Sequence, residues 1–321
     1  MQDLIAVVDL GASKILNGIA TAQGEILVKE KFPTNPENGP ADIIDRIADS
    51  IRKLSSWCGD YESQIVRVVA ATPGPLSYPE GVVVDSPNLA WARVPFKDEL
   101  SKRLVKPVIV EKDTNLAALG EYYFGRQGQP RSLLYITVST GIGGGIILDG
   151  RIWRGHKGGA GEIGHMVVEP QGRACNCGRR GCLEALASGA AIRHQVSELR
   201  QQGKGIGIVA LGNAKKDIGA EEVGEAARRG DAEALTLVSR VVEYLGRAVA
   251  NLVNIFNPEI VVLGGGVALG WQDLILERLN LDVKKEVFAI NTQDLKIEIT
   301  SLGEDIVLYG GIAAALQKSG I

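Results

Sequence analysis

Four residues in the middle of the chain have the types and spacing of a metal site. Cys175, Cys177 and Cys182 fall within a short loop, and His165 precedes them. Three thiolates and one imidazole complete a tetrahedral Zn²⁺ site of the closed, structural kind. Gly178 supplies a turn that helps the chain return to the ion. We therefore expect a structural zinc knot, with three reduced and unliganded cysteines as the alternative.

Acidic side chains flank this cluster. Glu162 lies three residues before His165, and Glu184 follows the last cysteine. Carboxylates that accept hydrogen bonds from neighbouring hydroxyl groups are suited to holding a sugar. If zinc binds one ring nitrogen of His165, the other nitrogen is free to face the same substrate. The alternative for each acid is a solvated side chain. His156 and His194 have no comparable setting, and we expect them in a loop and on a helix surface.

A glycine turn between two predicted strands has the composition of a phosphate site. In the segment DLGASK, residues 9–14, Gly11 lets the backbone approach a ligand, Ser13 offers a hydroxyl donor and Lys14 adds positive charge. A simple tight turn is the alternative.

Two further glycine turns follow other strands. Thr140–Gly145 (TGIGGG) matches the first turn in placement, and Gly264–Gly266 could pass beneath a nucleobase or ribose. None of the three is a Walker A sequence or a strand-to-helix GxGxxG motif, so P-loop and Rossmann sites are disfavoured.

Asp113 has the position of a general base. It stands between a predicted strand and a predicted helix that carries Leu116 and Leu119. Helix N–H groups favour its ionised form. A hydroxyl group is a poor nucleophile until its proton leaves, and phosphoryl transfer otherwise needs positioning and charge neutralisation. The alternative is that Asp113 or Thr114 is only the N-cap of the helix.

The bulk composition narrows the class of protein. The 321 residues carry 35 basic and 38 acidic side chains, a formal net charge of −3 that leaves no positive field for nucleic acid. No run approaches the roughly 20 apolar residues that span a bilayer, and the first residues lack the pattern of a secretory signal. We expect a cytoplasmic protein that binds neither nucleic acid nor membranes.

The hydrophobic pattern predicts an α/β protein of two lobes. Residues 4–9, 15–20, 26–28, 65–71, 107–110, 132–138, 146–148 and 260–263 are predicted strands in mostly parallel sheets, and the stretches 43–54 and 237–256 have helical spacing. Residues 201–216 are the most loop-like. Two strand–turn–strand openings suggest related lobes around a cleft. We expect a small lobe of residues 1–113, completed by 303–321, and a large lobe of residues 114–302 with the zinc site.

Together these segments resemble the ROK family of sugar kinases and repressors, which has an actin-like ATPase (ribonuclease H-like) fold. DLGASK and TVSTGIGGGI resemble its two phosphate loops, EKDTNLAALGE its base segment, and GGAGEIGH with CNCGRRGCLE its sugar-and-zinc signature. TPGPLSYPEGVVVDSPNLAW resembles its sugar loop, and LGEDIVLYGGIAAA its closing segment. The family's repressors carry a DNA-binding segment before the first strand. That strand is expected from about residue 3 here, which favours the kinase branch.

The resemblance implies roles for individual residues. Asp113 would be the catalytic base, with structural Zn²⁺ in the knot, Mg²⁺ accompanying ATP, and a homodimer as the assembly. The implied sugar contacts are Gly74, Pro87, Asn88, Lys112, Glu162, His165 and Glu184. The implied nucleotide contacts are Asp9, Gly11, Ser13, Lys14, Thr140, Gly141, Gly264, Gly265 and Gly266. The implied zinc ligands are His165, Cys175, Cys177 and Cys182.

Three residues depart from the family pattern. Ala12 replaces a usual glycine, Ser13 replaces threonine, and Lys112 replaces an asparagine that helps orient the sugar.

The leading interpretation is an ATP-dependent hexose kinase that converts glucose to glucose 6-phosphate. An N-acetylhexosamine kinase, acting on N-acetylmannosamine or N-acetylglucosamine, is one alternative, since Lys112 makes the assignment of glucose less secure than that of a kinase. A sugar-binding regulator with little turnover is another, favoured by Ala12 and Lys112.

Overall fold

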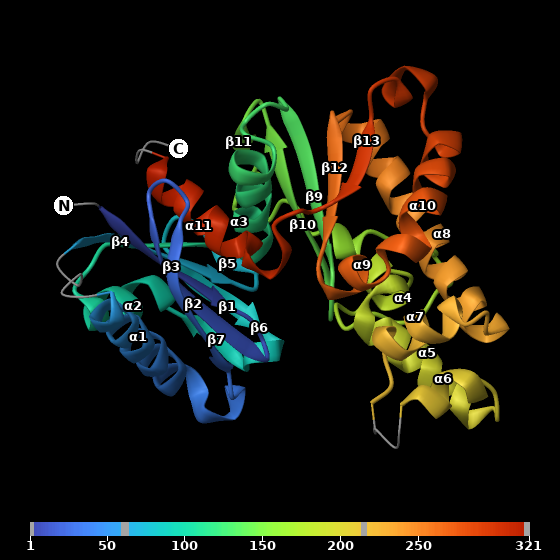
Figure 1. Cartoon of the computed structure of the whole chain (residues 1–321), viewed down its shortest axis with the longest axis horizontal. Coiled ribbons are helices and arrows are strands. Elements are labelled where there is room, and N and C mark those ends of the chain that lie inside the picture. The colour runs from blue at the N-terminus through green and yellow to red at the C-terminus, as the bar shows by residue number, and fades with distance from the viewer. Residues whose placement is uncertain (1–2, 59–63, 213–216, 318–321) are drawn as a thin grey trace. The chain divides into compact units, whose positions relative to one another are not determined.

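The chain divides into two compact units. The computed structural model describes residues 3–58, 64–212 and 217–317 (Figure 1). The first unit comprises Met1–Gln129, Gly145–Ala160 and Glu304–Ile321, and the second comprises Pro130–Gly144 and Gly161–Gly303. Among the described residues, no helix is both long enough and apolar enough to cross a membrane.

A five-stranded sheet forms the centre of the first unit. Its strands are β1 (Leu4–Leu10), β2 (Lys14–Thr21), β3 (Ile26–Pro33), β4 (Ile65–Thr72) and β8 (Val108–Lys112), in the order β3-β2-β1-β4-β8. β1, β4 and β8 are parallel, whereas β2 pairs antiparallel with both β1 and β3. The sheet is therefore mixed, and the prediction of a mostly parallel sheet was wrong here. Tight turns connect β1 to β2 and β2 to β3, and only antiparallel neighbours permit such short connections.

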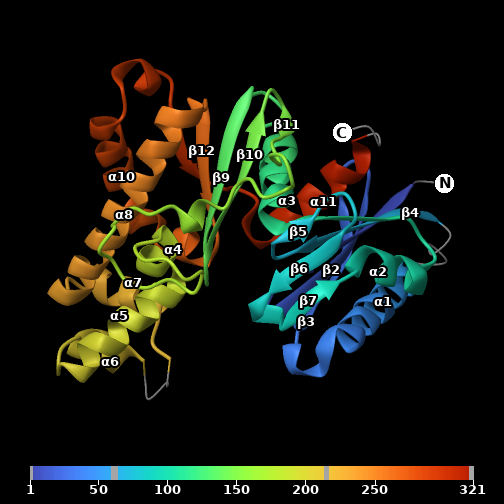
Figure 2. The ribbon, with the colours of Figure 1, turned by 180° about the vertical axis from the view of Figure 1, so that it is seen from behind.

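Two helices cover one face of this sheet. In α1 (Gly39–Trp57), Ile43, Ile44, Ile47, Ile51 and Leu54 are buried, as their helical spacing predicts. The shorter α2 (Phe96–Leu104) follows the small sheet described below and lies beside α1 (Figure 2).

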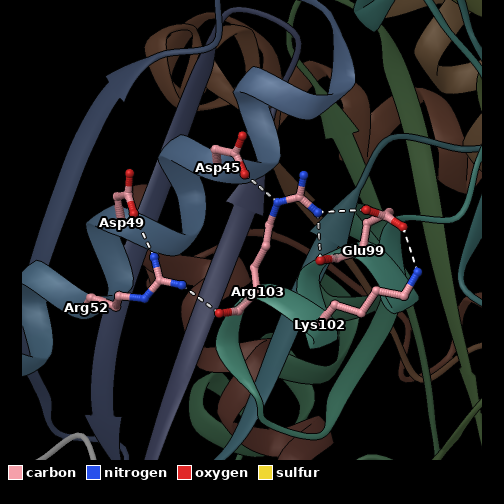
Figure 3. Close-up of polar contacts among 6 residues, drawn as sticks. All are labelled: Asp45, Asp49, Arg52, Glu99, Lys102 and Arg103. Atoms are coloured by element: carbon pink, nitrogen blue, oxygen red, sulfur yellow. Dashed lines mark hydrogen bonds and ion pairs between the residues drawn. The ribbon is translucent and has the colours of Figure 1, made fainter.

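Charged side chains connect these two helices on their exposed side. Arg103 of α2 contacts Asp45 of α1 at 2.5 Å and Glu99 at 2.7 Å (Figure 3). Arg52 of α1 donates to the backbone oxygen of Arg103 at 2.6 Å, which satisfies a carbonyl at the end of α2. The network therefore fixes the end of the helix that leads into β8.

The helix that carries Asp113 packs closely against the C-terminal helix. These helices are α3 (Asp113–Gly120) and α11 (Ile306–Leu316) (Figure 1). A Cβ atom added at Gly310 would lie 1.8 Å from the Leu116 oxygen, and one added at Gly120 would lie 2.4 Å from the Ile306 oxygen. This contact requires glycine on both helices. Both helices lie in the first compact unit, whose first segment continues to Gln129, and the lobe boundary after residue 113 stays a prediction.

A small three-stranded sheet completes the first unit. It contains β5 (Leu76–Ser77), β6 (Val82–Ser86) and β7 (Trp91–Val94), with the 3-10 turn η3 (Pro87–Leu89) between the last two. The turns η1 (Pro36–Asn38) and η4 (Glu121–Gly125) and the strand β11 (Arg151–Ile152) are its other short elements. The segment that resembles a sugar loop is therefore an ordered antiparallel structure.

The second sheet has the order β11-β10-β9-β12-β13. β9 (Ser132–Val138) has the predicted bounds, and it is parallel to β12 (Ile260–Gly264), which is in turn parallel to β13 (Lys296–Ile299). β10 spans Ile142–Leu148, so Gly143–Gly145 lie within a strand and the prediction of a turn there was wrong. These glycines permit close packing, since a Cβ atom on Gly144 would lie 2.1 Å from the Ile163 side chain.

Helices and short 3-10 turns are the other elements of the second unit. They are η5 (Ile163–His165), α4 (Leu183–Ala187), α5 (Gly189–Gln201), α6 (Ile206–Leu211), α7 (Ala220–Arg228), α8 (Ala232–Phe256), α9 (Gly266–Gly270), α10 (Gln272–Glu286) and η6 (Ala289–Thr292). The 3-10 turn η7 (Gly303–Asp305) begins with the last residue of this unit and continues into the first unit. The predicted helix over 237–256 is confirmed by α8, but α10 was not predicted. The loop-like stretch 201–216 contains α6, and its residues 213–216 lie outside the described part of the chain.

Candidate active site

Asp113 is the first residue of α3, directly after β8. It is half-buried, and its Oδ1 accepts a hydrogen bond from the Thr114 backbone N–H at 2.7 Å. The N-cap position is Lys112, in an extended conformation, so the predicted N-cap at Asp113 or Thr114 was wrong by one residue. The helix N-terminus and the Thr114 amide both favour the ionised carboxylate that a general base requires.

Asp9 lies at the same edge of the sheet. In the strand register Asp9 is opposite Ala71, and Ala71 is opposite Glu111, two residues before Asp113. Although Asp9 as a residue keeps some contact with solvent, protein atoms crowd its carboxyl group. This burial, reinforced by the negative charge of Asp113, raises the pKa of Asp9 to about 7, against the lowering effect of Lys31.

The first glycine turn is closed by its own backbone. The Gly11 N–H donates to the Lys14 oxygen at 3.0 Å, and a Cβ atom at Gly11 would lie 2.9 Å from that oxygen. Ser13 and Lys14 are exposed at the tip of the turn, available to a ligand. Ala12 has no positive φ, so replacing the usual glycine costs no backbone strain.

Two residues that the sequence analysis missed hold this turn in place. The buried Thr34 donates its hydroxyl hydrogen to the Gly11 oxygen at 2.7 Å, and its backbone N–H donates to the Ser13 oxygen at 3.1 Å. Arg46 of α1 in turn binds the Thr34 oxygen, and it contacts the Pro33 oxygen at 2.8 Å. Thr34 follows the predicted third strand by several residues, and no local sequence signal marks it.

The predicted sugar contacts of the first unit are distributed over the small sheet and β8. Gly74 is half-buried before β5, and Asn88 is exposed in η3. The side chain of Pro87 lies outside the described part of the structure. Lys112 is 5% exposed, and its ammonium group donates to the Ala160 oxygen at 3.2 Å. Lys112 thereby ties the end of β8 to the segment that follows β11.

In the second unit, an acid and a glycine turn contact each other directly. Glu184 Oε2 accepts a hydrogen bond from the Ile142 N–H at 2.9 Å, and a Cβ atom at Gly141 would lie 2.5 Å from the same oxygen. A side chain at position 141 would therefore displace the Glu184 carboxylate from its hydrogen bond to the Ile142 N–H. Glu162 is exposed, and its backbone oxygen accepts from the His165 N–H at 3.1 Å in η5.

The start of α5 fixes the other side of this turn. The N–H groups of Gly189 and Ala190 donate to the oxygens of Ser139 and Thr140 at 2.7 and 3.0 Å. Ser188 caps the same helix by accepting from the Ala191 N–H. The exposed Thr140 and the half-buried Gly141 are thus held by a rigid helix end, as a preorganised phosphate turn requires.

The structure brings the four predicted metal ligands together. One donor atom each of His165, Cys175, Cys177 and Cys182 lie within 4.8 Å of one another. The Cys177 and Cys182 sulfurs are 3.6 Å apart, and the Cys175 sulfur is 3.7 Å from His165 Nδ1. Tetrahedral Zn²⁺ with bonds of about 2.3 Å places two sulfurs about 3.8 Å apart, so the cluster fits this ion.

Electrostatics differ sharply among the three thiols. Hydrogen bonds from the Arg179 backbone and side chain lower the pKa of Cys177 to about 6. Burial and the neighbouring cysteines raise the pKa of Cys182 to about 12, and burial also raises the pKa of Cys175. Because their pKa values are raised, Cys175 and Cys182 become good ligands only when a cation stabilises their thiolate forms.

The third glycine turn ends β12 and begins α9. Gly265 has φ +86°, and a Cβ atom there would lie 2.6 Å from the Val138 oxygen. A Cβ atom on Gly264 would lie 2.2 Å from the Tyr135 hydroxyl, whereas Gly266 is exposed with open space around it. The turn therefore presents bare backbone, which suits a flat ligand such as a nucleobase.

Comparison with known proteins agrees with these features. The model of the ROK family matches residues 5–318. The chain belongs to the ROK family. It is 42% identical to a glucokinase of Thermotoga maritima over 98% of this chain and 97% of that protein.

Solved structures of other ROK proteins have the same fold. A ROK family glucokinase from Streptomyces griseus, in complex with glucose and AMPPNP, matches with a TM-score of 0.84 and 30% identity over 97% of this chain and 98% of that one. The ROK hexokinase of Thermus thermophilus matches with a TM-score of 0.81 and 32% identity over 97% of both chains. The predicted family and α/β fold are thereby confirmed.

Proposed function

We propose that this ROK protein is an ATP-dependent glucokinase that converts glucose to glucose 6-phosphate. The observation that carries the proposal is the common sheet edge of Asp113 and the glycine turn that begins with Asp9. A base and a phosphate turn at one edge of the same sheet are what phosphoryl transfer to a hydroxyl group requires. The full-length similarity to a protein named glucokinase favours glucose as the acceptor.

In the proposed reaction, the oxygen of the sugar 6-hydroxyl group attacks the γ-phosphorus of ATP, and Asp113 accepts the proton of that hydroxyl group. The new O–P bond forms while the bond to the β,γ-bridging oxygen breaks, and ADP leaves. The base, held ionised by the start of α3, needs no covalent step. Mg²⁺ bound with ATP supplies charge neutralisation in such reactions.

The remaining residues have proposed roles in binding. We assign the phosphates to Asp9, Gly11, Ser13, Lys14, Thr140 and Gly141, and the adenosine to Gly264–Gly266. We assign the sugar to Gly74, Pro87, Asn88, Lys112, Asp113, Glu162, His165 and Glu184. His165 Nδ1 faces Cys175. We propose that Nδ1 binds Zn²⁺, which leaves Nε2 for the substrate. A homodimer and a cytoplasmic location remain predictions.

An N-acetylhexosamine kinase is the second candidate. Lys112 weakens the assignment of glucose relative to that of a kinase, because it replaces the family asparagine that helps orient the sugar. The regulator interpretation loses part of its support, since Ala12 adopts its conformation without a positive φ.

A coupled ADP-release assay tests the proposal. Glucose, mannose, N-acetylglucosamine and N-acetylmannosamine are compared at saturating ATP, and we expect the highest kcat/KM with glucose. A preference for either N-acetylhexosamine would establish the second candidate. Sugar binding without turnover on any sugar would establish the regulator.

A further inference from the structure

A buried ion pair lies directly beside the proposed base. Glu111, two residues before Asp113, is 3% exposed, and its Oε2 accepts a hydrogen bond from Arg154 Nε at 2.7 Å. The other oxygen, Oε1, accepts from the Lys112 N–H at 2.9 Å and from Asn115 Nδ2 at 2.8 Å. Three donors therefore hold this carboxylate, one of them from the residue before the base and one from α3.

The same arginine reaches the small sheet. The guanidinium carbon of Arg154 lies 4.5 Å from the centre of the Tyr78 ring, which directly follows β5. A guanidinium group stacks on an aromatic face while its Nε–H donates in the plane of the guanidinium group, a combination that lysine does not offer. Arg154 thus connects the end of β8 to the segment that resembles a sugar loop.

The segment after β11 is fixed at its other end as well. The Ala160 N–H donates to the Arg154 oxygen at 3.0 Å, and the Ala160 oxygen accepts from Lys112 Nζ. Gly158 lies against Tyr78, since a Cβ atom there would be 3.3 Å from the tyrosine Cβ. Residues 154–160 therefore contact both the end of β8, through Lys112, and the small sheet, through Tyr78.

We propose that Arg154 is a positioning residue that sets the sugar loop, residues 72–91, relative to the base Asp113. This inference rests on the proposed sugar kinase function. Because small displacements of a base from its acceptor cost large factors in rate, a weakened Arg154 contact affects the sugar more than ATP. Glu111 orients the guanidinium group of Arg154 through the hydrogen bond to Nε, and Tyr78 provides the ring on which that group stacks.

The test is the substitution Arg154→Lys, which keeps the positive charge beside buried Glu111 and avoids leaving that carboxylate unpaired. We expect the glucose KM to rise by at least about 10-fold and kcat to fall, with the ATP KM within about twofold of the wild type. Equal changes in both KM values would overturn the proposal.

A second buried arginine pair in the same unit provides the matched control. Arg126 Nε lies 3.0 Å from Glu121 Oε1, and the two side chains are 24% and 0% exposed. Arg126→Lys changes another arginine–glutamate contact of the same unit, outside the small sheet, so we expect a lower melting temperature without a change in glucose KM. If Arg154→Lys behaves like this control, Arg154 has only a structural role.

Tyr78→Leu keeps the ion pair and removes only the stacking partner, so it serves if Arg154→Lys does not fold. We expect a rise of about threefold or more in glucose KM; an unchanged KM would contradict the link to the small sheet. Turnover by the wild type separates the two claims. A wild-type protein that phosphorylates no sugar refutes the proposed function, whereas an active wild type with an unaffected Arg154→Lys variant refutes only this inference.

Discussion

Asp9 lies one residue before the end of β1 and Asp113 directly follows β8 in the same sheet, and burial, reinforced by the negative charge of Asp113, raises the pKa of Asp9 to about 7. One strand, β4, separates them in the sheet order β1-β4-β8. Two carboxylates at one edge repel each other when both are ionised. Unless a cation compensates, Asp9 therefore holds a proton up to a higher pH than an ordinary aspartate does.

The pH dependence of stability should report on Asp9. Between about pH 4 and pH 7 the native protein retains a proton that the unfolded chain has released, since an unperturbed aspartate has a pKa of about 3.9. The contribution of Asp9 is thus fully present below about pH 4 and is lost as the pH rises to 7, so the free energy of unfolding falls. In Asp9→Asn we expect a smaller fall over this range.

Urea denaturation at several pH values measures this effect. The control is Asp98→Asn, a change of an exposed residue in α2. A wild-type curve that rises between pH 4 and pH 7, with an identical curve for Asp9→Asn, would show that Asp9 is ionised throughout.

Thr34→Val should weaken ATP binding. Valine matches the shape of threonine but lacks the hydroxyl hydrogen bond to the Gly11 oxygen, which costs about 1 kcal/mol of stability. We expect the ATP KM to rise about 5-fold or more while the glucose KM stays constant, because the turn that is loosened is the one proposed to bind the phosphates of ATP. Steady-state kinetics with each substrate varied measures both constants. Thr34→Ser restores the hydroxyl and should recover most of the ATP KM; failure to recover would assign the effect to packing.

Much of the local structure was predictable because the relevant residues are close in sequence. The four residues of the metal cluster lie between His165 and Cys182, and the apolar spacing of α8 extends over most of its 25 residues. The helix α10 escaped prediction because only Ile275, Leu279 and Val283 of its 15 residues are buried. Its hydrophobic stripe is too narrow to stand out from a polar segment.

The missed site residues act over long sequence distances. Thr34 is 23 residues from its partner Gly11, and Arg154 is 43 residues from Glu111. The sequence around Thr34 and around Arg154 shows no motif, because each residue meets its partner only when the sheet brings separate segments together. The glycines of β10 were misread for a related reason. A Cβ atom at Gly145 would lie 2.3 Å from the Thr114 oxygen, a contact that exists only in the folded chain.

Loss of the metal should affect the sugar before the nucleotide. In Cys177→Ser, or after strong chelation, His165 loses the ion proposed to orient it. Removing the groups that orient the ligands of a metal typically lowers affinity or activity by about 10- to 100-fold, and we expect an effect of that order on glucose binding. We expect glucose binding to weaken well before ATP binding, with both measured by calorimetry. Cys58→Ser, a cysteine outside the cluster, should change neither the metal content nor the affinities. Parallel loss of both affinities together with unfolding would mean that the metal supports the unit as a whole.

The turnover number of Asp113→Asn with glucose tests the central claim most directly. Asparagine preserves the size of the side chain and can still accept from the Thr114 N–H, but it cannot take up the proton of the hydroxyl group. We expect kcat to fall by at least about 10²-fold while glucose and ATP still bind and the melting temperature stays near that of the wild type. A variant that turns over glucose at nearly the wild-type rate would contradict the account and reduce Asp113 to the first residue of a helix.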